Sequence, residues 1–240
     1  MILKPSNIKI IFGFIYLIII LVILYFLFSY IDLDDLTNYE ILKENKDTIF
    51  KYKNENFLLF YFIFFVGIIF WNLILGIGSI PAIIGGFIFG KWWGTIILIL
   101  GNTIGATLFY FLAKTFFSEF IEYHLSKKFS KFIIFIKKNE LLYFTIFRLI
   151  GGGGAPLPIQ NTLPVVFNMS IKNYMIGTFL GIIPTTFITV ALGSGIESVI
   201  EKNTKLTFSS VFYSPEIYIP IFCFLIILIA AFILKRIFFK

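Results

Sequence analysis

The sequence predicts an all-α polytopic membrane protein, with about four spanning helices and two re-entrant hairpins arranged as an inverted repeat. Three observations predict it: an apolar composition, long runs without charge, and an uneven distribution of charge between those runs. Of the 240 residues, 59% are hydrophobic and only 14% are charged, whereas a soluble domain carries about 25% charged residues. A water-soluble core cannot bury this much apolar surface, so much of it must face lipid.

Five runs contain no Asp, Glu, Lys or Arg: 10–31, 57–90, 92–113, 173–196 and 217–234. About 20 residues cross the bilayer core as a helix, so four of these runs fit one span each. Run 57–90 is too long for one span and short for two. Run 10–31 is longer than the apolar region of a signal peptide and has no cleavage site after it, which predicts an anchor that is retained.

The charges between the runs predict the orientation. Basic residues gather near the N-terminus, in 114–138 and in the C-terminal tail, whereas 32–55 and 197–216 are acidic or mixed. The positive-inside rule places the basic regions and both termini in the cytoplasm, and we expect a bacterial inner (plasma) membrane. Run 57–90 and segment 132–168 must then each enter and leave on one side, as hairpins that turn near 76–86 and 151–161.

The two halves resemble each other. The segments "GNTIGAT" (101–107) and "GTFLGII" (177–183) both carry Gly-x-x-x-Gly at an offset of 76 residues, and the same offset takes Pro81 to Leu157, between two prolines. Opposed hairpins in two halves are typical of the inverted repeats of transporters. We expect three parts: an N-terminal anchor and external loop (1–56), a repeat domain (57–197), and a loop with a C-terminal span (198–240).

The segment "FRLIGGGGAPLPIQN" (147–161) interrupts two apolar stretches. Each glycine costs a helix about 1 kcal/mol relative to alanine, and each proline removes a backbone donor and disfavours helix before it. A helix from about 140 should therefore end near 150. Backbone polar groups would then be open within the membrane, where they must face protein or a wet cavity.

Arg148 lies just before this break. No acidic residue occurs in 57–117 or 141–196, so the remaining partners are backbone carbonyls, Asn or Gln side chains, or a bound anion. A lipid phosphate suits a guanidinium because the two groups can pair through two parallel hydrogen bonds. Alternatively, Arg148 lies shallow and snorkels to the headgroups. Asn72 and Asn102 are expected to bond across helices more readily than to touch substrate.

Other chemistries find little support. The glycine run lacks the Lys-Ser/Thr of a phosphate-binding loop, and no nucleophile and base accompany it. Cys223 is the only cysteine, so no internal disulfide forms, and there is no metal or haem spacing. The net charge of +7 fits topology and anionic headgroups rather than nucleic acid. We therefore expect a protein that is not an enzyme and has no cofactor.

These motifs resemble the VTT domain (SNARE-associated Golgi protein, or DedA-like) family over about 57–197. The positions that fit the pattern are Arg148, Pro156, Pro158, Asn161, Gly177, Thr178, Gly181, Pro184, Leu192 and Gly193, with Gly86, Phe89 and Gly90 in the first hairpin. The sequence departs from the pattern at 164–166, which lack the usual glycine. It also lacks acidic residues near the first hairpin, which favours the branch named after a yeast Golgi vesicle protein. The resemblance implies membrane lipid handling.

The resulting hypothesis is translocation or scrambling of phospholipids or lipid-linked carriers. Membrane lipids with anionic headgroups would be the partners, and a homo-oligomer is possible. The alternatives are an ion- or proton-coupled small-solute transporter, which would need an acid at membrane depth, and a non-transporting scaffold. The expected substrate-binding residues are Arg148, Gly151, Gly152, Gly153, Gly154, Pro156, Pro158, Gln160, Asn161, Pro81, Gly85 and Gly86.

Overall fold

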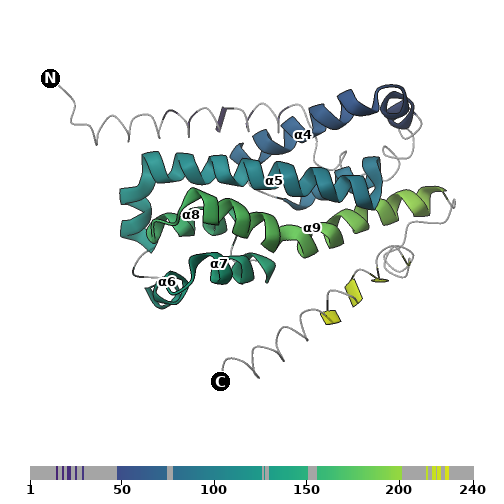
Figure 1. The fold of residues 1–240 in the computed structure, drawn as a ribbon. Helices are drawn as coiled ribbons and strands as arrows, with labels where there is room; N and C mark the ends of the chain where they lie inside the picture. The colour runs from purple at the N-terminus through teal and green to yellow at the C-terminus, as the bar shows by residue number, and fades with distance from the viewer. Residues whose placement is uncertain are drawn as a thin grey trace. The chain divides into compact units, whose positions relative to one another are not determined.

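The computed structural model describes residues 48–74, 78–125, 127, 130–150 and 156–201, with isolated positions nearer both ends (Figure 1). Their regular secondary structure is entirely helical, which confirms the all-α class for this part of the chain. The helices are α4 (Phe57–Ile74), α5 (Ser79–Leu125), α6 (Ser130–Lys137), α7 (Glu140–Leu149), α8 (Leu157–Val166) and α9 (Ile171–Glu201). The glycine run 151–154 and most of the first and last predicted spans lie outside the described residues.

Three helical stretches are long and apolar enough to cross a membrane: Phe57–Ile74, Ser79–Glu119 and Ile171–Ile196. Large apolar side chains lie on their surfaces, among them Leu58, Phe62 and Phe70 on α4. Such a surface requires lipid as its solvent. The prediction of an integral membrane protein is therefore supported, whereas the number of crossings stays a prediction.

Helix α5 contains a sharp bend at Gly90, whose φ of 72° and ψ of 177° are not helical. A Cβ built on Gly94 would lie 2.8 Å from the Gly85 carbonyl oxygen, although residues nine apart in a straight helix are separated by about 13.5 Å. The predicted turn near 76–86 is therefore wrong over 79–86, which is helical. The bend falls at Gly90 because glycine adopts a positive φ without a steric penalty.

The chain divides into two compact units, one of residues 1–78 and 99–182 and the other of 79–98 and 183–240. In the second unit, Gly86 and Gly193 allow the backbones of α5 and α9 to come into direct contact. A Cβ on Gly86 would overlap the Val190 carbonyl, and one on Gly193 would overlap the Ile83 carbonyl. Gly85 and Gly86 thus serve helix packing here, and not the turn that the sequence suggested.

In the first unit, the 76-residue offset between the halves reappears in the packing. In each half, two glycines four residues apart on a long helix, α5 or α9, contact two residues four apart on an earlier helix, α4 or α7. Small residues allow such close approach in membrane helices. The four contacts are Gly101 with Ile68, Gly105 with Asn72, Gly177 with Phe144, and Gly181 with Arg148. Each contact of the first pair becomes one of the second when 76 is added to both numbers, so the internal repeat is structural.

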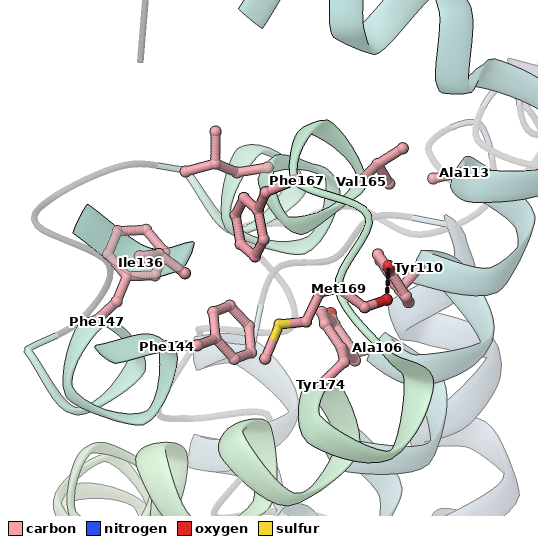
Figure 2. Packing of buried hydrophobic residues seen from close by; sticks show 11 residues of the cluster. Ala106, Tyr110, Ala113, Ile136, Phe144, Phe147, Val165, Phe167, Met169 and Tyr174 are labelled. Carbon is pink, nitrogen blue, oxygen red and sulfur yellow. Dashed lines mark hydrogen bonds between the residues drawn. The ribbon is translucent and has the colours of Figure 1, made fainter. Parts of the chain in front are cut away.

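The core of the first unit contains residues of α5, α6, α7, α8 and α9, packed around aromatic side chains (Figure 2). Tyr110, Phe144, Met169 and Tyr174 are fully buried, and Figure 2 shows the Met169 side chain beside Phe144. The Met169 carbonyl accepts hydrogen bonds from the Tyr110 hydroxyl at 2.6 Å and from Lys114 Nζ at 3.2 Å. These two bonds fasten the α8–α9 connection to α5.

Replacing Gly86 or Gly193 with alanine tests the backbone contact in the second unit. The added methyl group overlaps a main-chain carbonyl that no rotamer change can move, so each variant should lose roughly 1–3 kcal/mol of stability. Thermal unfolding in detergent measures this loss. Gly67→Ala is the matched control, because nothing lies within 4 Å of its Cβ position and alanine favours helix. Unfolding of Gly86→Ala and Gly193→Ala at the wild-type temperature would contradict the contact.

Candidate functional site: a buried arginine cluster

Helix α7 carries Arg148 in its last turn and ends at Leu149, as the glycine run predicted. Its start is fixed by Asn139, whose side-chain oxygen accepts a hydrogen bond from the Leu142 N–H at 3.2 Å, and by Glu140 in the first turn. A carboxylate near the start and a cation near the end both suit the helix dipole. The sequence therefore places Arg148 where the helix stops and its final carbonyls lack intrahelical donors.

Helix α8 begins sooner after the break than the sequence suggested. The irregular stretch was expected over 151–161, but 157–161 is already helical. Pro156 caps α8 and Pro158 lies in its first turn, where a missing N–H removes no helical bond. Gln160 and Asn161 are therefore held on a helix, which fixes their direction better than a loop would.

Arg148 is buried among these helices, with only 2% of its side chain exposed. Its Nη2 donates to Asn161 Oδ1 at 2.5 Å and to the Tyr174 hydroxyl at 2.8 Å, and its Nη1 donates to Gln160 Oε1 at 3.4 Å. The expectation of amide side chains as partners is thus confirmed for Gln160 and Asn161. The alternative in which Arg148 snorkels to the headgroups is wrong, because the guanidinium lies inside the protein.

The partners of Arg148 leave its charge uncompensated. All three acceptors are neutral, and no carboxylate pairs with it among the residues that the structure describes. The guanidinium carbon lies 5.1 Å from the centre of the Phe144 ring and 5.6 Å from that of Tyr174, distances at which aromatic rings attract a cation. Its Nε–H has no acceptor in the described part of the chain. The cluster is therefore a buried positive charge with spare donor capacity.

Tyr174 belongs to the cluster, although the sequence analysis did not identify it. Its hydroxyl accepts from Arg148 and donates to Asn161 Oδ1 at 3.2 Å. Its ring stacks on Tyr110, with centroids 4.4 Å apart and planes at 11°. The available signal was a tyrosine in the first turn of an apolar span, because a buried phenol usually finds a hydrogen-bond partner.

The remaining predicted site residues lie elsewhere. Pro156 and Pro158 are exposed at the start of α8. Pro81, Gly85 and Gly86 are buried in the second compact unit, so the first-unit contacts described here do not include them. The four glycines of 151–154 lie outside the described residues, and their role stays a prediction.

The position equivalent to Arg148 in the first repeat is Asn72, 76 residues earlier. Its Nδ2 donates to Asn102 Oδ1 at 2.7 Å and to the Ile68 carbonyl at 3.0 Å. The predicted bond across helices is therefore confirmed. The first repeat holds a satisfied amide pair where the second holds a cation.

This geometry lies within the part of the chain that matches a known family. The VTT domain family model matches residues 76–195, which include α8, Arg148 and the buried glycines. The chain belongs to the VTT domain family. The resemblance drawn from Arg148, the prolines and the Gly-Thr motif is thus confirmed.

Several membrane proteins are similar to the chain. Mouse transmembrane protein 41B is 26% identical over 165 residues, which are 68% of this chain and 56% of the mouse protein. The Golgi apparatus membrane protein tvp38 of Neosartorya fischeri is 28% identical over 53% of this chain and 30% of its own length. The transmembrane protein 41 homolog of Caenorhabditis elegans is 23% identical, with 72% of each chain covered.

The alignments cover about half or less of the mouse and Neosartorya proteins. The Golgi proteins agree with the branch that the sequence favoured. These relatives are eukaryotic, so the bacterial inner membrane stays a prediction. No solved structure matches the chain.

Tyr174→Phe tests whether the tyrosine hydroxyl holds the cluster together. The change removes one acceptor of Arg148 and one donor to Asn161 while it keeps the ring stack, so we expect a loss of about 1–3 kcal/mol in stability. Thermal unfolding measures it, with Tyr123→Phe as the control because Tyr123 is exposed. Equal unfolding temperatures for Tyr174→Phe and wild type would show that the two bonds contribute nothing.

Proposed function

We propose that the protein translocates or scrambles phospholipids or lipid-linked carriers, and that Arg148 contacts the phosphate of the headgroup. One observation carries the proposal: a fully buried guanidinium held by neutral acceptors, with an Nε–H that no described residue uses. A phosphate supplies both the opposite charge and the acceptor oxygens that this group lacks. The transport involves no covalent chemistry and no cofactor.

The lengths of α7 and α8 support a re-entrant hairpin that ends inside the membrane. Each helix has ten residues and so extends about 15 Å, half of the roughly 30 Å hydrocarbon core. A pair of such helices can enter and leave from one face, as a re-entrant hairpin does. Arg148 then lies at the deep end of the hairpin, where its charge is most costly to keep without a ligand.

Family membership supports the same proposal. The resemblance to the VTT domain family implies membrane lipid handling, and the similar proteins bear membrane-protein names. A proton-coupled solute transporter would need an acid at membrane depth, yet 57–117 and 141–196 contain none. A scaffold would gain nothing from a buried cation with spare donors.

Cysteine labelling tests the orientation that the hairpins require. In a Cys223→Ser background, single cysteines at positions 45 and 208 should react with an impermeant reagent from outside. Cysteines at 128 and 238 should react only after the membrane is opened, because basic segments remain in the cytoplasm. Reaction of position 128 from outside would exclude the arrangement with two hairpins.

Substitution of Arg148 tests the phosphate contact. Arg148→Gln keeps an amide donor for Asn161 and Tyr174 but removes the charge, so lipid translocation should fall at least about tenfold, as expected for loss of a charge-assisted hydrogen bond. Arg148→Lys keeps the charge without the planar donor fork and should retain part of the activity. A liposome assay with labelled phospholipids measures the rates, and Lys138→Gln controls for loss of a surface charge.

Thermal unfolding of the same proteins separates a transport role from a structural one. If Arg148 only supports the fold, Arg148→Gln should unfold earlier while the folded fraction still moves lipid at the wild-type rate. Normal translocation by a stable Arg148→Gln protein would remove Arg148 from the lipid path.

A further inference from the structure

Threonines in the helices of this protein usually bond back to their own helix. Six of them donate their hydroxyl to the carbonyl four residues earlier, a common arrangement for threonine in a helix. They are Thr95, Thr107, Thr115, Thr145, Thr162 and Thr189. Thr178 does not: its side chain is 1% exposed, and its Oγ1 has no hydrogen bond within the described ranges. Its hydroxyl is therefore unused in a place that water does not reach.

Thr178 lies on the face of α9 that covers Arg148. It follows Gly177 and precedes Gly181, the two glycines that contact Phe144 and Arg148. It also lies one helical turn after Tyr174. Its hydroxyl lies close to that of Tyr174, but outside the distance and angle limits of a well-formed hydrogen bond. Thr178 is thus part of the arginine cluster.

The internal repeat gives independent support for this position. Subtracting the offset of 76 from 178 gives Asn102, and subtracting it from 148 gives Asn72. In the first repeat these two side chains touch through a 2.7 Å hydrogen bond. The equivalent residues of the second repeat, Thr178 and Arg148, make no such bond to each other, which leaves a polar contact open at this point.

One further donor of the cluster is without an acceptor among the described residues. The Nε–H of Arg148 has no acceptor in the described segments. Asn161 receives two hydrogen bonds at its oxygen, from Arg148 and from Tyr174. Buried donors without acceptors are rare in folded proteins. Two of them in one cluster, the Arg148 Nε–H and the Thr178 hydroxyl, indicate an acceptor that comes from a ligand, and the oxygens of a phosphate can accept from both.

We propose that Thr178 is a further ligand-binding residue, which donates its hydroxyl to the same phosphate as Arg148. This inference rests on the proposed function, since it takes the ligand to be a lipid phosphate. Thr178 sets the orientation of the phosphate, because its hydroxyl is on α9 whereas the Arg148 guanidinium is on α7.

Valine in place of Thr178 tests the proposal, since it keeps the shape and removes the hydroxyl. The probe is dihexanoylphosphatidylglycerol, titrated into the purified protein in detergent and followed by intrinsic fluorescence. Thr178→Val should bind it roughly tenfold more weakly, the loss expected for one hydrogen bond to a charged group. Thr178→Ser, which keeps a hydroxyl, should bind within about threefold of wild type. Without ligand, Thr178→Val should unfold at an equal or higher temperature, because an unpaired buried hydroxyl is gone.

Thr103→Val is the matched control. Thr103 is also buried, at 5% exposure, and its Oγ1 also lacks a hydrogen bond to the described residues, but no cation is recorded beside it. Thr103→Val should match Thr178→Val in stability and match wild type in binding. Equal weakening of binding by both variants would overturn the proposal.

The pattern across variants separates the two proposals. If Arg148→Gln abolishes binding and Thr178→Val binds like wild type, the role of Thr178 is wrong and the proposed function survives. If wild type does not bind the phospholipid, both proposals fail.

Inorganic phosphate and dihexanoylglycerol, titrated in the same way, identify the source of the ligand. Binding of phosphate alone, with the same dependence on Thr178, would support the donors Arg148 and Thr178 and count against a lipid, whereas binding of dihexanoylglycerol would overturn a phosphate site.

Discussion

The burial of Arg148 without a carboxylate constrains the surrounding structure. An arginine inside a membrane protein must satisfy its donors within the protein or through a ligand, because the hydrocarbon offers no acceptor. Here the acceptors come from Gln160 and Asn161 on α8 and from Tyr174 on α9. The positions of α7, α8 and α9 along one another must therefore keep these side chains within hydrogen-bond distance. The capped start of α7, the proline start of α8 and the aromatic core beneath Tyr174 all maintain that register.

Close helix contact depends on small residues at fixed places. Gly181 lies against the Cβ of Arg148, and Gly177 lies against the Phe144 ring, so α9 can cover the cluster only where it lacks side chains. In the first repeat, the equivalent glycines Gly101 and Gly105 lie against Ile68 and Asn72. The two repeats thus share a packing scheme while they differ in the polar group enclosed, which indicates that packing and chemistry can change separately.

Sequence reasoning identified what depends on composition and local backbone preference. It predicted the membrane class, the end of α7 near 150, amide side chains among the possible partners of Arg148, and the 76-residue offset. It placed a turn near 76–86, whereas 79–86 is helical and α5 bends at Gly90. Several glycines in this region could each permit a turn, and only tertiary packing selects one. Tyr174 and Thr178 were missed as site residues because their roles depend on which face of α9 meets α7, and an apolar run shows no clear periodicity.

Neutral partners suit a binding cation better than an acidic partner would. A carboxylate beside Arg148 would orient the guanidinium, but it would also neutralise the charge and occupy the donors that a phosphate needs. Asn161 and Tyr174 orient the group through dipoles, and the Phe144 ring lowers the cost of the charge, so the net attraction for an anion remains. Under the proposed function, the first repeat has no equivalent charge, since Asn72 and Asn102 bond to each other. A phosphate would then meet a buried arginine in the second repeat and a neutral amide pair in the first. One charged site binds a phosphate less tightly than two and releases it sooner, as rapid lipid movement requires.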